Sequence, residues 1–360
     1  IGAKQAITVN SGSAANLVAF MTLTSPKLKD RAIVPGDEVI SVAAGFPTTI
    51  NPIIQFGAVP VFIDIDIPTY NIKVDDIESA ITKKTKAIMI AHALGNPFNI
   101  KKIREICDKY NLWLIQDSCD ALGAKFDGKP LGYYGDIGTV SFYPAHHITM
   151  GEGGLVFTNS IKLKKIAESF RDWGRDCYCE TGKDNTCNKR FDWQLGNLPE
   201  GYDHKYTYTH MGYNLKITDM QAACGLAQLN KLEKFIKKRV ENFNYLHSLF
   251  SKLNDYFILP KKTEGSEPSW FGFLLTIKDD KIKRNEFLKF LDKKKIGTSL
   301  FFAGNVTKQP YIMDKKFLIH SNLNNTDIAM NNSFWVGVYP GLEKEHLDYI
   351  YNSVCEFLKK

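Results

Sequence analysis

Four cysteines have a spacing that could hold a metal centre. Cys177 and Cys179 are separated by one residue, Cys187 follows after a gap of seven residues, and 57 residues separate Cys119 from Cys177. Thiolates in this number can hold a structural zinc ion or an iron–sulfur cluster. Zinc sites usually contain cysteine pairs with a gap of about two to four residues, so the one-residue gap favours iron–sulfur. The spacing alone leaves both metals open.

Two adjacent histidines, His146 and His147, follow the apolar stretch that ends in Ser141-Phe142. A neutral imidazole is a good base near neutral pH because its unperturbed pKa is about 6.5. Either histidine could therefore exchange a proton with a substrate. The alternative is that the pair only packs within a loop.

Two further positions could bind a cofactor. Ser11-Gly12-Ser13 stands where a strand gives way to a helix, and the free N–H groups of a helix start attract anions such as phosphate. The same residues could instead form an ordinary helix cap. Asp117 ends the apolar run 112–116, at the rim where α/β proteins bind ligands, and could hold a pyridine nitrogen protonated. It could equally cap the segment that follows.

The elements that must position these residues alternate between strands and helices. We expect strands at 38–42, 59–63, 87–92, 112–117, 138–142 and 154–158, and helices at 14–23, 48–56, 74–81 and 100–110. This alternation predicts βαβ units and a mostly parallel, buried sheet.

The second half of the chain has a different pattern. Residues 172–203 are rich in Cys, Gly, Asn and Asp, show little periodicity, and are long for a plain loop, which favours a functional segment. One or two amphipathic helices follow at 219–253, and then a strand at 271–277 and helices at 284–291 and 347–358. We therefore predict a large cofactor-binding domain at 1–225, with a Cys-rich insertion at 172–203, and a smaller one at 226–360.

The order of motifs resembles the StrS/DegT-type sugar aminotransferases, a family of fold-type-I vitamin-B6 enzymes. The resemblance spans nearly the whole chain and rests on the segments 11–16, 44–48, 64–71, 117, 141–144, 151–154 and 212–214. It implies a large α/β domain with a mostly parallel seven-stranded sheet and a smaller C-terminal α/β domain. It also implies a homodimer with shared sites.

The resemblance assigns cofactor contacts. Gly12, Ser13 and Ser141 would bind the cofactor phosphate. Phe46 would stack on the pyridine ring, and Asp117 would pair with its nitrogen. Asp120 falls where the family usually has His or Gln beside the cofactor, and Asn214 would reach the phosphate in the neighbouring subunit.

One departure from the family decides the expected reaction. The family's Schiff-base lysine falls on His146 in the run Ser141-Phe142-Tyr143-Pro144-Ala145-His146-His147. Because imidazole cannot form that bond, pyridoxamine phosphate would bind non-covalently and condense with a 4-keto sugar. His146 would then remove a proton from the cofactor's C4′ carbon, and the hydroxyl at sugar C3 would leave.

The cysteine layout resembles that of the cluster-dependent sugar 3-dehydratases within this family. It implies a [2Fe–2S] cluster on Cys119, Cys177, Cys179 and Cys187. A separate flavin and iron–sulfur reductase using NADH or NADPH would supply electrons, and the chain shows no Gly-x-Gly-x-x-Gly opening of its own. The substrate would be a CDP-linked 4-keto-6-deoxyhexose of dideoxyhexose (lipopolysaccharide O-antigen) biosynthesis.

Three alternatives remain open. The first is a cluster-free dehydratase acting on a GDP-sugar, which would share His146. The second is an ordinary pyridoxal phosphate sugar aminotransferase, which the missing lysine opposes. The third is a non-catalytic regulator built on the same fold. Lys216, Phe302, Asn305 and Lys308 are candidate substrate contacts.

Composition and charge limit the partners and the cellular compartment that we expect for this protein. The net charge is +7, but Lys and Arg are scattered along amphipathic stretches such as 231–239 and 281–295, as on solvated helix faces, so we expect no nucleic-acid partner. No apolar run is long enough for a membrane span, and no signal peptide is visible. Seven cysteines then indicate a reducing, cytoplasmic setting, with Cys107, Cys224 and Cys355 as buried packing residues. Because the chain enters a strand and a motif almost at once, we interpret it as lacking an N-terminal piece.

Overall fold

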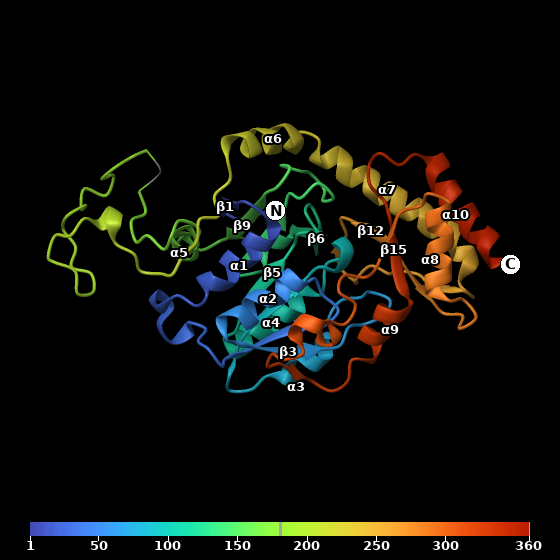
Figure 1. The fold of residues 1–360 in the computed structure, drawn as a ribbon, viewed down its shortest axis with the longest axis horizontal. Helices are drawn as coiled ribbons and strands as arrows, with labels where there is room; N and C mark the ends of the chain where they lie inside the picture. The colour runs from blue at the N-terminus through green and yellow to red at the C-terminus, as the bar shows by residue number, and fades with distance from the viewer. Residues whose placement is uncertain (180–181, 360) are drawn as a thin grey trace.

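A mixed eight-stranded sheet forms the centre of the protein, for which a computed structural model describes residues 1–179 and 182–359 (Figure 1). The sheet has the order β1-β9-β8-β5-β4-β2-β3-β14. Five neighbouring strands from β8 to β3 run parallel, whereas β9 is antiparallel to both β1 and β8. The strands are β1 (Gln5–Val9), β2 (Glu38–Val42), β3 (Val59–Ile63), β4 (Thr85–Ala91), β5 (Trp113–Asp117), β8 (Ile137–Ser141), β9 (Gly154–Thr158) and β14 (Leu318–Ile319).

The predicted fold class is confirmed, with one addition to the sheet. Seven strands come from the first half of the chain, and the two-residue strand β14 from the C-terminal part extends the edge beside β3. The strands β2, β3, β5 and β8 are buried along their whole length. Their largely apolar sequences reflect this, because a parallel sheet is covered on both faces.

Helices cover both faces of the sheet. One apolar core joins α1 (Gly12–Thr22) and α5 (Ile161–Arg171) to the sheet, and a second core joins α3 (Ile77–Ala80) and α4 (Ile100–Tyr110) to it. Helix α2 (Pro47–Phe56) packs against α1 and β3. Helix α5 was not among the predicted helices, although Ser160 caps it through a hydrogen bond to the N–H of Leu163.

The strand directions decide where the site forms. Since β1 and β8 are both antiparallel to β9, they point the same way, and their carboxyl ends meet at one edge. Asp117 and Ser141 end the parallel strands β5 and β8 at that edge, and the start of α1 follows β1 there. Residues that are far apart in the sequence therefore converge.

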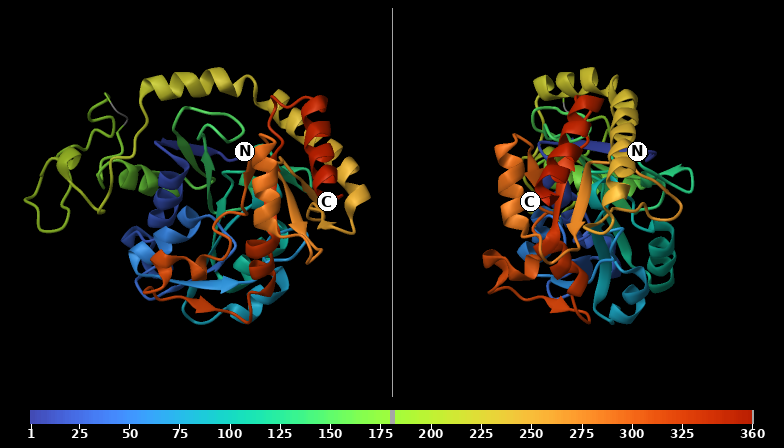
Figure 2. Two further views of the ribbon diagram at one scale, coloured as in Figure 1. Left: turned by 45° about the vertical axis from the view of Figure 1, so that its right-hand side comes forward. Right: turned by 90° about the vertical axis from the view of Figure 1, so that its right-hand side faces the viewer.

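The C-terminal part has its own antiparallel sheet and aromatic core. Helix α6 (Asp219–Leu229) is followed by α7 (Leu232–Phe250), which leads into a sheet of order β10-β12-β15-β13. Figure 2 shows α8 and α10 packed beside this sheet. The remaining elements are β10 (Phe257–Ile258), β12 (Gly272–Ile277), α8 (Arg284–Lys293), β13 (Thr298–Ser299), α9 (Asn324–Asn332), β15 (Ser333–Gly337) and α10 (Lys344–Leu358), and a small sheet of β6 (Lys125–Phe126), β7 (Lys129–Pro130) and β11 (Ser266–Glu267).

The predicted division at residue 225 stays a prediction. Residues 219–253 were predicted to form one or two helices. They form two, because the helical conformation is interrupted between α6 and α7. The predicted insertion 172–203 extends away from the sheet beyond α5 (Figure 1), and its residues 180–181 lie outside the described residues.

Two expectations about burial were wrong. Cys224 was expected in the core, but it is exposed because none of the residues of α6 is buried in this chain. Arg239 was expected on a solvated helix face, but it is only 3% exposed because α7 turns that side toward the loop after β8. Cys107 is buried, as predicted.

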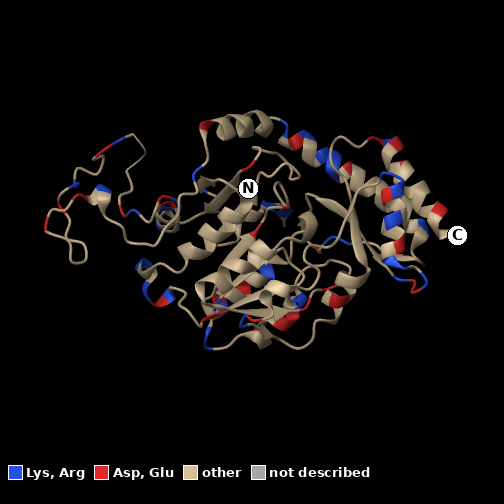
Figure 3. Ribbon diagram, in the orientation of Figure 1, with Lys and Arg blue, Asp and Glu red and all other residues tan. Residues whose placement is uncertain are grey.

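Acidic and basic residues are spread along the chain, as Figure 3 shows, with basic residues recurring along α7. Among the residues that the structure describes, no helix combines the length and the apolar character needed to cross a membrane.

Candidate active site

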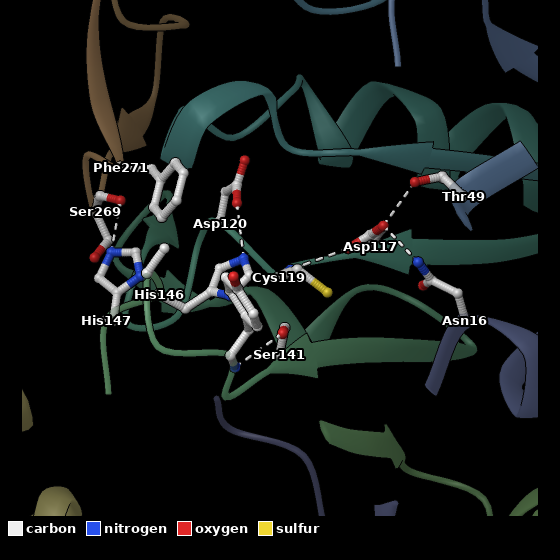
Figure 4. Close-up of polar contacts among 12 residues, drawn as sticks. Asn16, Thr49, Asp117, Cys119, Asp120, Ser141, His146, His147, Ser269 and Phe271 are labelled. Atoms are coloured by element: carbon white, nitrogen blue, oxygen red, sulfur yellow. Dashed lines mark hydrogen bonds and ion pairs between the residues drawn. The ribbon is translucent and has the colours of Figure 1, made fainter. Parts of the chain in front are cut away.

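Asp117 lies at the centre of the hydrogen bonds at the sheet edge (Figure 4). Its Oδ2 accepts from Asn16 Nδ2 at 2.8 Å and from Thr49 Oγ1 at 2.7 Å, and its Oδ1 accepts from the backbone N–H of Cys119 at 3.0 Å. These three donors fix a carboxylate that is only 5% exposed. A carboxylate has about four acceptor positions, so one position on Oδ1 remains for a ring N–H.

The start of α1 forms an anion cradle against the end of β8. Ser11 Oγ accepts from the N–H of Ala14, and the Ser11 carbonyl accepts from Ala15, so the helix itself does not use the N–H groups of Gly12 and Ser13. A Cβ added to Gly12 would lie 2.5 Å from Ser141 Cβ and 2.7 Å from its Oγ. Only glycine therefore allows the helix start and Ser141 to approach this closely, which suits a phosphate.

Phe46 stands at the start of α2 with half of its surface exposed (51%). An exposed aromatic ring is suited to stack on a planar ligand. Asn16 and Thr49, which hold Asp117, were not among the residues predicted for the site. Asn16 was within a motif used for the resemblance, but nothing in its sequence context indicated a partner 101 residues away.

His146 and Asp120 form a pair beside this edge. The distance between His146 Nε2 and Asp120 Oδ1 is 3.2 Å, and the two side chains are 15% and 12% exposed. Burial raises the pKa of the Asp120 carboxyl, and the hydrogen bond to His146 opposes that rise. The imidazole also stacks on Phe271 with ring centroids 5.2 Å apart. Asp120, expected to contact the cofactor, thus contacts His146.

His147 lies in a different environment. It is 2% exposed, and its Nε2 donates to the carbonyl of Ser269 at 3.0 Å. Burial, together with the nearby Arg239, lowers the pKa of His147 well below its usual value, so the ring is neutral and serves as a structural donor. Figure 4 shows His147 beside Ser269, whereas His146 faces Asp120 and Ser141. The geometry favours His146 as the base.

Three of the four cysteines of the predicted cluster are neighbours. Cys177, Cys179 and Cys187 line one small pocket in the segment 172–203 together with His204. A hydrogen bond from Thr186 to its sulfur lowers the pKa of Cys179 to about 7, whereas burial raises the pKa of Cys177. These thiols have the donor chemistry of a cluster site.

Cys119 does not join them in this structure. Its sulfur lies at the sheet edge, close to Gly12, whereas the other three thiols lie in the segment that projects beyond α5 (Figure 1). Burial raises the pKa of Cys119 well above its usual value. Within residues 1–179 and 182–359, no group of three or more His, Cys, Asp or Glu side chains is arranged to hold a metal ion. The four residues therefore do not fit a cluster in the arrangement seen here.

None of the other candidates has a hydrogen bond to Asp117 among those between the described residues. Asn214 is exposed and accepts from Lys216 Nζ at 2.7 Å, so its contact with a neighbouring subunit stays a prediction. Asn305 is 2% exposed and donates to Asp327, which also pairs with Lys308. These contacts indicate a structural role for Asn305. Phe302 lines a small pocket with Thr49.

A cavity of about 1010 Å³ opens on the far side of the loop 144–149, between α7 and the end of β15. His146, Arg239 and Phe271 are in its wall, but Gly12, Phe46 and Asp117 are not. The loop that carries His146 thus separates this cavity from the Asp117 edge.

The sheet and the ligand-binding edge define a fold-type-I vitamin-B6 enzyme scaffold, and comparison with known proteins gives the family. Residues 1–355 match the model of the DegT/DnrJ/EryC1/StrS aminotransferase family, and the chain belongs to this family.

Several relatives of the chain are named as 3-dehydratases of nucleotide-linked deoxysugars. The chain is 62% identical to lipopolysaccharide biosynthesis protein RfbH of Salmonella typhimurium over 358 residues, 99% of this chain and 82% of that protein. It is 52% identical to dTDP-4-dehydro-2,6-dideoxy-D-glucose 3-dehydratase of Saccharopolyspora spinosa, covering 100% of this chain and 78% of that protein. Escherichia coli GDP-4-keto-6-deoxy-D-mannose-3-dehydratase with bound hydrated PLP superposes with a TM-score of 0.87 at 31% identity, covering 98% and 88% of the two chains.

Proposed function

We propose that this chain is a pyridoxamine-phosphate-dependent dehydratase that removes the C3 hydroxyl of a nucleotide-linked 4-keto-6-deoxyhexose. The observation that carries the proposal is His146, an imidazole held beside Asp120 at the position of the family's lysine. The relatives of known activity cited above are 3-dehydratases, which supports the reaction class.

The residues of the edge fit this cofactor. The N–H groups of Gly12 and Ser13, with the Ser141 hydroxyl, would hold its phosphate, and Phe46 would cover its ring. Asp117 would accept the ring N–H at the remaining position on Oδ1 and keep that nitrogen protonated. When bound, the cofactor supplies an amine for the 4-keto group and an electron sink.

His146 supplies the proton chemistry. An imidazole that is not bonded covalently to the cofactor is free to take a proton from C4′ and to return one. Asp120 holds the ring through Nε2, and Phe271 supports its face, so that the base keeps one orientation during the reaction.

Substitution of His146 tests this proposal, with His147 as the matched control. His146→Asn should bind pyridoxamine phosphate normally but consume the CDP-linked 4-keto-6-deoxyhexose about 10²- to 10⁴-fold more slowly, because a general base is lost. His147→Gln keeps a donor for Ser269 and should change turnover only slightly. Mass spectrometry of the sugar product measures both. Normal turnover by His146→Asn would show that this residue is not the base.

The finer form of the proposal concerns the nucleotide and the electron supply. We infer that the substrate is CDP-linked and that Cys119, Cys177, Cys179 and Cys187 would hold a [2Fe–2S] cluster, for which an NAD(P)H-dependent flavin and iron–sulfur reductase would be the electron donor. Three adjacent thiols, one of them with a lowered pKa, support this inference. The segment 172–203 would have to move for Cys119 to become the fourth ligand.

Anaerobic reconstitution with iron and sulfide tests the cluster. About two irons per chain with visible charge-transfer absorption are expected, and Cys179→Ala and Cys119→Ala should each lose that absorption, whereas the exposed Cys224→Ala should keep it. Binding of zinc alone, or full iron content in Cys119→Ala, would contradict the four-ligand assignment.

We also propose a homodimer. Helix α6 has no buried residue, and it leaves Met220, Leu226 and Leu229 81%, 68% and 54% exposed. Apolar side chains on a helix are ordinarily covered, and a second copy would cover these while bringing Asn214 toward the neighbouring site.

A further inference from the structure

Arg239 is a buried cation that no role proposed so far explains. It lies on α7, in the C-terminal part of the chain, and is 3% exposed. A buried guanidinium is costly unless its donors are paired. Burial lowers the pKa of Arg239 to about 10, and nearby Asp120 opposes this, so the side chain remains a cation near neutral pH.

Its two terminal nitrogens point to the loop that carries the proposed base and to Phe271, whereas its buried Nε has no hydrogen-bond partner among the described residues. One terminal nitrogen, Nη2, lies 3.4 Å from the carbonyl oxygens of both Ala145 and His146. The other, Nη1, donates to the carbonyl of Phe271 at 3.2 Å. Phe271 in turn stacks on the imidazole of His146. One planar guanidinium thus contacts the backbone of His146 and the backbone of Phe271, whose ring stacks on the His146 imidazole.

We propose that Arg239 is a positioning residue for His146. It fixes the His146 backbone and the Phe271 backbone relative to each other, and Asp120 fixes the imidazole through Nε2. Lysine could not replace it, because a single ammonium cannot span three carbonyl oxygens in the geometry of a planar fork. The orientation of the base therefore depends on α7 and on the C-terminal part of the chain. The importance of that orientation for catalysis rests on the proposed function.

The first test needs no cofactor and no turnover. Carbethoxylation of His146 by diethyl pyrocarbonate is followed by mass spectrometry in the cofactor-free protein, with the exposed His346 on α10 as an internal reference. Arg239→Lys should raise the rate of modification of His146 at least about threefold, because the loop is released. Arg284→Lys is the matched control, since Arg284 also bonds backbone carbonyls, those of Met330 and Ser333, away from this loop.

The second test separates positioning from folding. Arg239→Lys should lower kcat at least about tenfold while KM and the Kd for pyridoxamine phosphate stay within about twofold of the wild type. If Arg239→Lys misfolds, Phe271→Leu, which removes the stacked ring but leaves its carbonyl, should also speed modification of His146.

The outcomes are distinct. A modification rate and a kcat equal to the wild type in Arg239→Lys would overturn the proposal. If the wild type itself shows no dehydration, the proposed function fails, but the rate of His146 modification still decides whether Arg239 holds the loop.

Discussion

Replacement of Asp117 by Asn separates the structural role of this carboxylate from its role toward a cofactor. The carboxylate accepts three hydrogen bonds, two on Oδ2 and one on Oδ1. An amide has only one acceptor oxygen. If the –NH₂ group of the introduced amide occupies the position of Oδ1, it faces the backbone N–H of Cys119. If the –NH₂ group occupies the position of Oδ2, it faces the side-chain amide of Asn16. Either orientation leaves a buried donor without an acceptor.

The magnitude follows from these contacts. A buried unpaired donor costs about 1–3 kcal/mol, and the remaining bonds lose their charge-assisted strength, so the free energy of unfolding should fall by about 2 kcal/mol or somewhat more. The loss of the ion pair with a ring N–H should weaken pyridoxamine phosphate binding by a further 2–3 kcal/mol or so, which is roughly 30- to 150-fold in Kd.

Asp64 offers a matched control. It is 2% exposed and also accepts three hydrogen bonds, from the N–H of Asn325 and from the N–H and hydroxyl of Thr326 on α9. Asp64→Asn should therefore lose a similar unfolding free energy, again about 2 kcal/mol, without a direct effect on the cofactor.

Urea unfolding of the cofactor-free variants, followed by tryptophan fluorescence, measures the loss of unfolding free energy. Fluorescence titration with pyridoxamine phosphate measures the change in its Kd. The reasoning is refuted if Asp117→Asn binds the cofactor as tightly as the wild type. It is also refuted if Asp64→Asn loses the same affinity, because destabilisation alone would then explain both.

Three further predictions concern the cradle, the core and the surface. Gly12→Ala should destabilise the protein by about 1–3 kcal/mol in urea unfolding and weaken phosphate binding, because its Cβ would overlap Ser141, whereas Gly297→Ala, with no atom within 4 Å of the new Cβ, should do neither. Burial lowers the pKa of His92 to about 4, below about 6.5 in the unfolded chain, so stability should fall as the pH drops through that window, by about 2 kcal/mol between pH 7 and pH 5. His92→Gln should reduce the loss of stability between pH 7 and pH 5 by about this amount, and a loss equal to that of the wild type would assign it to other groups such as the buried His147. Leu226→Asp on α6 should shift the protein toward monomers in analytical ultracentrifugation, and an unaltered dimer would place the interface elsewhere.

The sequence alone determined the layered fold and the chemical groups at the end of each strand. The predicted strands at 38–42 and 59–63 have these same bounds in the structure, and the run 59–63 is apolar throughout because a strand buried on both faces has few polar positions. The approach of Gly12, Asp117 and Ser141 to one edge also follows from parallel strand direction. Helix α5 was not predicted, although a serine caps its start. Strand β14 was not predicted either, because its two residues are too few to show an alternation of apolar and polar positions.

Only the tertiary structure decided which groups touch. It separated His146, paired with Asp120, from His147, which is bonded to Ser269, although the two residues are adjacent in the sequence. It buried Arg239 in a helix whose other basic residues face solvent, and it left Cys119 apart from the other three thiols. These outcomes depend on side-chain direction and on contacts between segments about 25 to 120 residues apart, and local sequence patterns carry no record of either.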